Sequence, residues 1–178
     1  MSTITGKVWV AKDYVMAYDI IIQNFWTSPI DPAENAKWVM AGVSEEFNRE
    51  NAFTEQEFTF ISAKHNFAGG GKSIEHVIAG LMGAGIKAVF AISFARLQFR
   101  NAINYGLPFV QCESLAEESV TGDLLSWDSE NNTVTNARSG KTYSTASIPS
   151  FVSEIAQSGG LMPFIAEKIK NNTLHTLQ

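Results

Sequence analysis

Short apolar runs and amphipathic stretches alternate along the first two-thirds of the chain. Runs rich in β-branched and aromatic residues are typical of strands, and continuous apolar runs are typical of strands buried on both faces. On this basis we expect strands at residues 6–12, 19–26, 55–64, 86–93 and 108–113. The third strand is followed directly by a run of glycines.

The stretches between these runs repeat apolar residues every three or four positions, which predicts helices. We expect them at residues 31–42, from residue 74 to the glycines at 83–85, and at 94–106. Asp31 should cap the first of these helices, with Pro32 in its first turn. Glycine follows each stretch and is expected to end the helix there. This order implies parallel strands joined by right-handed helical crossovers.

The last third of the chain has a different character. Residues 123–144 contain strand-like segments separated by Asp-Ser-Glu-Asn-Asn and Arg-Ser-Gly turns, which predicts a small antiparallel meander. Residues 147–160 and 161–172 follow with helical patterns. We therefore expect one α/β domain over residues 1–178, with an antiparallel excursion.

Composition and charge narrow the functional classes. The 178 residues are 45% hydrophobic and 17% charged, as in ordinary globular proteins. A net charge of −5 argues against a nucleic-acid binder, and no apolar run reaches the roughly 20 residues of a membrane span. The chain starts without a secretory pattern and has one cysteine, Cys112, so we expect a reducing, cytoplasmic location.

The sequence His-Asn-Phe-Ala-Gly-Gly-Gly-Lys-Ser-Ile-Glu-His, residues 65–76, raises the question of a phosphate-binding loop. A Walker A loop requires a glycine five residues before Gly71, and Asn66 stands there. The sequence therefore argues against a nucleotide site. A glycine-rich turn that opens into a helix still exposes backbone N–H groups and can bind a carboxylate. The alternative is a tight turn in which Ser73 only caps the helix.

Residues beyond this loop carry a set of further motifs. They are Asn66-Phe67, Glu75-His76, Gly85-Ile86, Ser93-Phe94-Ala95-Arg96, Arg100-Asn101 and residues 104–108, Asn-Tyr-Gly-Leu-Pro. With these motifs the chain resembles the small subunit of 3-isopropylmalate dehydratase and the swivel domain of aconitase, from about Gly6 to Lys170. The resemblance implies the three-layer swivelling β/β/α domain of the aconitase superfamily.

The same resemblance implies the small subunit of a heteromeric iron–sulfur hydro-lyase. Its substrate would be a hydroxy-dicarboxylate, in the first place 3-isopropylmalate, with homoaconitase and dimethylmalate dehydratase as close relatives. One cysteine cannot hold a [4Fe–4S] cluster, so the resemblance places the cluster on a separate large subunit and no metal on this chain. The alternative is a non-catalytic scaffold or regulatory paralogue that binds the large subunit.

The loop departs from the family pattern Gly-Ser-Ser-Arg-Glu-His, whose first serine is the proposed base and whose arginine binds a substrate carboxylate. Here Gly71-Lys72-Ser73-Ile74 precedes Glu75, and the loop is one residue longer. In one hypothesis Lys72 replaces the arginine and Ser73 serves as base or hydrogen-bond donor. In a second, Lys72 is the base, with a pKa lowered by desolvation and the helix dipole. In the third, catalysis is lost.

The remaining candidates have supporting roles. Gly70 and Gly71, with Lys72 and Ser73, are expected to bind substrate, whereas Asn66, Glu75 and His76 are expected to support the loop. His65 and Asp19 are weaker candidates near the same edge. We expect Arg100 to be structural and Cys112 to be buried, and the sequence leaves the role of Arg96 open.

Overall fold

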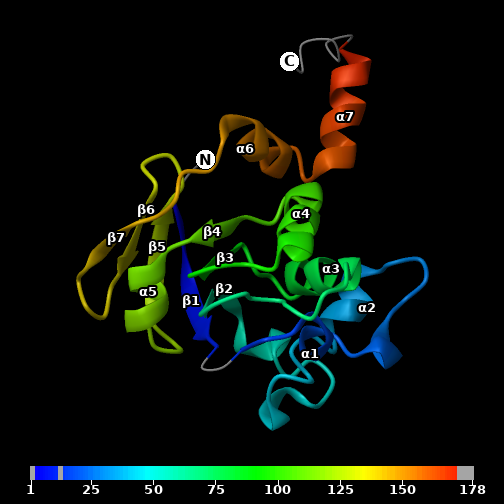
Figure 1. The fold of residues 1–178 in the computed structure, drawn as a ribbon, viewed down its shortest axis with the longest axis horizontal. Helices are drawn as coiled ribbons and strands as arrows, with labels where there is room; N and C mark the ends of the chain where they lie inside the picture. Colours follow the sequence, from blue (N-terminus) through cyan, green and yellow to red (C-terminus); the bar gives the residue numbers. More distant parts are fainter. Residues whose placement is uncertain (1–2, 12–13, 172–178) are drawn as a thin grey trace.

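The computed structural model describes residues 3–11 and 14–171, and there seven strands form one mixed sheet (Figure 1). The strand order is β4-β3-β2-β1-β5-β6-β7, with β1 to β4 parallel and β5 antiparallel to β1. The antiparallel half, β5 to β7, is the predicted meander. The strand bounds are β1 Ile4–Val10, β2 Phe58–Ala63, β3 Ala88–Ala91, β4 Phe109–Gln111, β5 Leu124–Asp128, β6 Thr133–Asn136 and β7 Thr142–Ser144.

Helices connect the parallel strands and close the chain (Figure 1). They are α1 Ala17–Ile20, α2 Pro32–Ala36, α3 Glu75–Gly83, α4 Arg96–Tyr105, α5 Glu113–Glu118, α6 Ser150–Gln157 and α7 Leu161–Lys170, with short 3₁₀ turns η1 Gln23–Phe25, η2 Glu45–Phe47 and η3 Thr54–Gln56. None of the helices in the described part of the chain has the length and apolar character needed to cross a membrane.

Two hydrophobic cores lie on opposite faces of the parallel strands, so the fold has three layers. One core lies between the parallel strands and helices α2, α3 and α4. The other joins the opposite face of those strands to the inner face of the meander and to α5. Phe90 of β3 and Trp127 of β5 make an edge-to-face contact with ring centroids 5.8 Å apart, although two strands separate them in the sheet. The sheet therefore curls onto itself, which confirms the predicted β/β/α fold.

Two helix boundaries follow from local chemistry that the sequence displays. The Asp31 side chain accepts hydrogen bonds from the backbone N–H groups of Ala33 and Glu34, with Pro32 at the start of α2. Gly106 ends α4 in a left-handed conformation, φ +78°. Both match the prediction, because capping carboxylates and C-terminal glycines satisfy the backbone groups that a helix end leaves unpaired.

Two predictions about elements were wrong, and one helix was missed. Residues 19–26 form α1 and η1 instead of a strand, since β1 already has β2 on one side and β5 on the other. Ile20 and Ile21 are buried all the same, and the carbonyl groups of Ile20 and Asp19 accept hydrogen bonds from the N–H groups of Met40 and Gly42. Helix α2 ends at Ala36 instead of Gly42, and the chain continues in turns. Helix α5 was not predicted.

The contact between α2 and α3 gives a stability prediction. A Cβ atom on Gly83 would lie 2.0 Å from the carbonyl oxygen of Pro32 and 3.0 Å from the Cβ of Ala36. We expect Gly83→Ala to separate the two helices and to lower the free energy of unfolding by about 2–3 kcal/mol. Gly80→Ala is the matched control, because its Cβ would lie 3.4 Å from the nearest atom. Denaturant unfolding of both variants checks this, and equal stability of the two would contradict it.

Candidate functional site

The loops that follow β1 and β2 lie side by side at the carboxyl edge of the parallel strands. Gly69 donates its N–H to the carbonyl oxygen of Val15 (3.2 Å), and the Ala17 N–H donates to the carbonyl oxygen of Gly69 (2.9 Å). The Asn66 side chain donates to the Tyr14 hydroxyl at 2.9 Å. The carboxyl ends of parallel strands share one edge of a sheet. The loop within residues 65–76, called here the glycine loop, is therefore bonded to the segment after β1 through both backbone and side-chain groups.

The loop after β3 fixes the other flank. The Phe67 N–H donates to the carbonyl oxygen of Ser93 (3.0 Å), and the Ala95 N–H donates to the carbonyl oxygen of Phe67 (3.0 Å). The Asn66 N–H donates to the Ser93 hydroxyl at 2.8 Å. These bonds hold the first half of the glycine loop, and the supporting role of Asn66 stays a prediction.

The second half of the loop is exposed. Gly70 and Gly71 have φ angles of +104° and +77°, and both residues are exposed together with Lys72 and Ser73. Such φ values favour glycine, because a Cβ atom clashes with the backbone there. The four predicted substrate-binding residues therefore form one continuous exposed turn before α3.

Lys72 presents a cation on this turn. Its Nζ lies 5.5 Å from the ring centroid of Tyr18, within the range of a cation–π contact. A hydrogen bond with Tyr18 raises the pKa of the Lys72 amine above its ordinary value. In the free chain Lys72 is therefore a charged amine suited to bind an anion. The desolvation that the base hypothesis needs is not present there.

Ser73 is tied to α4 and does not cap α3. Its hydroxyl lies 3.2 Å from Asn101 Oδ1 and accepts a hydrogen bond from Asn101 Nδ2 at 3.0 Å. Asn101 Nδ2 also contacts Gln98 Oε1 (3.4 Å), and Gln98 donates to the Lys72 carbonyl oxygen (3.2 Å). The N-cap of α3 is Ile74, which makes no side-chain capping bond. The capping alternative for Ser73 was therefore wrong.

Ile74 belongs to the core. Its side chain is 3% exposed and packs with the cluster beneath α3. A side chain at this position therefore cannot bind substrate in the observed conformation. Among residues 71–74, Lys72 supplies the positive charge at the surface.

Glu75 and His76 support segments around the loop. Glu75 Oε2 accepts a hydrogen bond from the Tyr105 hydroxyl at 2.9 Å, which joins the start of α3 to the end of α4. His76 Nε2 lies 2.9 Å from the Thr27 carbonyl oxygen, and its ring stacks on Trp26 with centroids 5.1 Å apart. His76 therefore holds the segment after η1 against α3, and its contact is with that segment instead of with the glycines.

Comparison with known proteins gives matches along nearly the whole chain. The 3-isopropylmalate dehydratase small subunit of Hydrogenobaculum sp. is 39% identical over 169 residues, which cover 94% of this chain and 99% of the relative. The isopropylmalate/citramalate isomerase small subunit of Methanocaldococcus jannaschii is 36% identical over 168 residues, covering 94% and 96%. The crystal structure of 3-isopropylmalate dehydratase (LeuD) from Methanocaldococcus jannaschii has a TM-score of 0.84 and 30% identity, covering 97% of this chain and 98% of that chain. No protein-family model matches the chain.

The chain belongs to the 3-isopropylmalate dehydratase small-subunit family. This membership confirms the fold and the main functional prediction, the small subunit of a hydro-lyase. A small subunit of this family implies a heteromeric complex with a large subunit. The catalytic and binding roles of Lys72, Ser73, Gly70 and Gly71 stay predictions.

The dehydratase small-subunit family is that of an iron–sulfur enzyme, so we tested whether this chain can hold the cluster. Residues 3–11 and 14–171 contain no group of three or more histidine, cysteine or acidic side chains placed to bind a metal ion. Cys112 is 4% exposed in the second core, and burial raises the pKa of its thiol. The described residues therefore do not fit a cluster, whose ligands are thiolates.

The remaining sequence candidates lie around the site without entering it. Arg96 and Arg100 are exposed on α4, and His65 is exposed at the start of the loop. Asp19 is partly buried in α1, where its backbone carbonyl accepts a hydrogen bond from the Gly42 N–H. No ion pair within residues 3–11 and 14–171 involves Arg96 or Arg100.

Sequence reasoning missed four residues that contact the glycine loop. Tyr14 and Tyr18 reach it from the segment after β1, and Gln98 and Asn101 reach it from α4. The sequence could have indicated Asn101, because it lies in the Arg100-Asn101 motif and its polar side chain falls on the inner face of the predicted helix. Nothing in the sequence indicated the two tyrosines, since their contact with the loop depends on how the segment after β1 folds back toward it.

The Tyr105–Glu75 contact gives a pH prediction. Burial, and then the hydrogen bond to Glu75, raises the pKa of Tyr105 to about 12. An unfolded tyrosine ionises near pH ~10, so the stabilisation is complete below that pH and is lost as the pH rises from about 10 to 12. We expect Tyr105→Phe to remove the highest-pKa step from the phenolate absorbance titration and to flatten the pH dependence of unfolding. Tyr14→Phe is the control, and loss of the same step there would contradict the assignment.

Proposed function

We propose that this chain works with a cluster-binding large subunit to dehydrate and rehydrate a hydroxy-dicarboxylate, in the first place 3-isopropylmalate. The observation that carries this proposal is the 39% identity to a 3-isopropylmalate dehydratase small subunit over 94% of the chain. The relative from Methanocaldococcus jannaschii is named for isopropylmalate and citramalate, which supports the same class of substrate. Both are hydroxy-dicarboxylates, so the site needs to bind carboxylate groups.

Lys72 supplies the carboxylate contact in this proposal. Its exposed amine is charged and stands beside two glycines and ahead of the nine-residue helix α3. Backbone N–H groups at a helix start and a nearby ammonium both favour a negative charge at the same place. A lysine binds a carboxylate as a point charge, whereas the arginine of the family pattern binds it bidentately. We therefore place the substrate carboxylate against Lys72 and the loop amides.

Ser73 acts on the proton or donates a hydrogen bond. Asn101 and Gln98 are 7% and 0% exposed, and they fix the position of the Ser73 hydroxyl beside the lysine. Dehydration of a hydroxy-acid removes a proton from carbon, so a base has to reach that carbon. The proposal allows two assignments of the base: the first is Ser73 and the second is Lys72. The second requires that the large subunit cover Lys72 and exclude water from it.

The large subunit completes the site in this proposal and carries the [4Fe–4S] cluster. All four loop residues from Gly70 to Ser73 are exposed in the free chain, as expected if a second polypeptide closes over them. Cys112 is buried away from this surface. A reducing compartment such as the cytoplasm suits a cluster enzyme and a chain with one free thiol.

A scaffold or regulatory paralogue is the second candidate function. The observation that favours it is Ile74, which is buried where the family pattern has a substrate-binding arginine. In this case the chain binds the large subunit but adds no chemical group to the reaction. The two functions differ in whether changes at Lys72 and Ser73 alter turnover.

Reconstitution tests the proposed function. The isolated chain is expected to be colourless, to bind no iron and to be inactive with 3-isopropylmalate, because one cysteine cannot hold the cluster. Addition of the large subunit encoded in the same genome is expected to give turnover. The measurements are the visible spectrum and iron content of the chain and the dehydratase assay of the complex. Stoichiometric iron on the chain alone, or an inactive complex with an intact cluster, would overturn the proposal.

Substitutions in the loop separate a catalytic subunit from a scaffold. Lys72→Ala should remove a charge-assisted contact of roughly 1.5–3 kcal/mol and reduce kcat/KM about 10- to 150-fold. Ser73→Ala should act mainly on kcat. Lys87→Ala is the matched control, since Lys87 is also exposed but lies at the amino end of β3, the opposite edge of the sheet.

Steady-state kinetics of the reconstituted complex, with a thermal melt of each variant, checks these outcomes. Neither loop substitution should unfold the domain: Lys72→Ala changes an exposed side chain, and Ser73→Ala, which removes the bonds to Asn101, should lower the melting temperature by only a few degrees. Wild-type kinetics in both loop variants would support the scaffold.

A further inference from the structure

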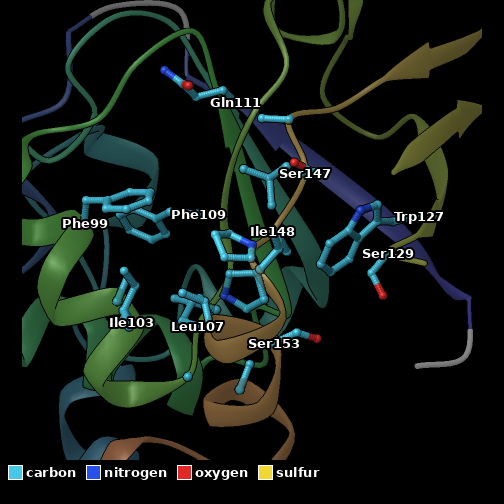
Figure 2. Close-up of a pocket in the computed structure, with 18 residues that line it drawn as sticks. Phe99, Ile103, Leu107, Phe109, Gln111, Trp127, Ser129, Ser147, Ile148 and Ser153 are labelled. Carbon is cyan, nitrogen blue, oxygen red and sulfur yellow. The ribbon is translucent and has the colours of Figure 1, made fainter. Parts of the chain in front are cut away.

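Helix α4 has an apolar face and a face that carries two buried amides. On the apolar face, Phe99 and Ile103 line a cavity of about 310 Å³ (Figure 2). On the other face, Gln98 and Asn101 are 0% and 7% exposed and bond to the glycine loop. A buried amide needs hydrogen-bond partners in the protein, because burial takes water away from it. The partners of Gln98 and Asn101 therefore decide which way each amide points.

The carbonyl group of Lys72 fixes the orientation of both amides. A carbonyl oxygen only accepts hydrogen bonds, so the end of the Gln98 amide that faces it, at 3.2 Å, is the donor Nε2. Gln98 Oε1 then faces Asn101, and the end of the Asn101 amide that approaches Oε1, at 3.4 Å, is the donor Nδ2. One backbone carbonyl thus sets the direction of this chain of hydrogen bonds.

The same Asn101 amide holds the Ser73 hydroxyl. Asn101 Nδ2 carries two hydrogens, one for Gln98 Oε1 and one for Ser73 Oγ, which lies 3.0 Å away. The proton of the Ser73 hydroxyl has Asn101 Oδ1 as an acceptor at 3.2 Å. Loss of that proton leaves the bond from Nδ2 in place, and a donated N–H stabilises negative charge on an oxygen. Ser73 Oγ is therefore held in one place in both of its protonation states.

We infer that Asn101 is a positioning residue of the dehydratase reaction: it holds Ser73 Oγ where the substrate proton arrives, and Gln98 keeps the Asn101 N–H turned toward the serine. This inference rests on the function proposed above, with Ser73 as the base. Asn101 acts through the Ser73 oxygen and does not itself touch the substrate.

The step that this arrangement serves is the transfer of one proton. Ser73 is exposed in the free chain, so its own proton first passes to water. The ionised Ser73 Oγ then takes the proton from the substrate carbon. The electron pair of the broken C–H bond forms the double bond, and the substrate hydroxyl group leaves with the electron pair of the C–O bond. The Asn101 N–H stabilises the negative charge on Oγ before this transfer.

NMR of the free ¹⁵N-labelled chain tests the hydrogen bonds without an assay of activity. The side-chain NH₂ group of Asn101, whose two hydrogens are both bonded, should exchange with solvent more slowly than that of Asn104, which is exposed on the same helix. Ser73→Ala and Gln98→Met should each shift the Asn101 signals, and Asn101→Ala assigns them by deleting them. Equal exchange at Asn101 and Asn104, or Asn101 signals that Ser73→Ala leaves in place, would contradict the arrangement.

A double-mutant cycle in the reconstituted complex separates positioning from support of the fold. Asn101→Ala should lower kcat about ten- to a hundredfold with little change in KM, because it removes a hydrogen bond to an oxygen that is charged in the proton-transfer step. In a Ser73→Ala background the same substitution should have no further effect on kcat. A loss of the same factor in both backgrounds would mean that Asn101 only supports the fold, and the inference would be wrong.

Asn101→Asp separates the donated N–H from the shape of the side chain. Aspartate has the shape of asparagine but no N–H, so this variant should be at least as slow as Asn101→Ala, whereas a role in packing alone would make it the faster of the two. Asn104→Asp adds the same charge at an exposed position of α4 and should keep wild-type kinetics. Gln98→Met should also lower kcat, and it takes the place of Asn101→Ala in the cycle if the Asn101 variants do not fold.

The same kinetics distinguish this inference from the proposed function. Wild-type kinetics in both Lys72→Ala and Ser73→Ala would mean that the proposed function fails, and the positioning role fails with it. A slow Ser73→Ala variant beside Asn101→Ala and Gln98→Met variants that are as fast as the wild type would overturn the positioning role alone.

Discussion

The alignment of three parallel strands is the constraint on which the rest of the molecule depends. Strands β1, β2 and β3 end at one edge, so the loops after them meet there. Backbone hydrogen bonds then join the glycine loop to the segments on both sides. These bonds leave Lys72 and Ser73 on an exposed turn whose base is rigid. A surface of this kind can meet a second subunit with its polar groups already in position, which reduces the ordering cost of assembly.

Helix α4 lies between the glycine loop and an apolar cavity. Gln98 and Asn101 face the loop and position Ser73, whereas Phe99 and Ile103 face the apolar cavity. The polar side chains are buried and bonded to one another, as buried amides need to be. One helix therefore has a polar face toward the glycine loop and an apolar face toward the cavity, which Ala102 also lines.

In the proposed function, the loop of this chain would supply the groups of the family pattern in a different order. A cation, a hydroxyl and glycine amides are all present, but the cation comes before the hydroxyl, and the position before Glu75 belongs to the core. Lysine is a flexible point charge, so it can reach a carboxylate from more than one backbone position. Under the proposed function, a lysine in this place would keep an anion contact but with looser geometry.

The sequence by itself determined the parallel strands, the meander, the capped start of α2, the glycine end of α4 and the family, because these depend on local periodicity and short motifs. Tertiary structure alone decided three matters. The apolar run at residues 19–26 folds as helical turns, since both edges of β1 are occupied. Ser73 bonds to Asn101 of α4 instead of capping α3, and Ile74 turns into the core. Each of these depends on contacts between segments far apart in the chain, which a local pattern of hydrophobic and polar residues does not contain.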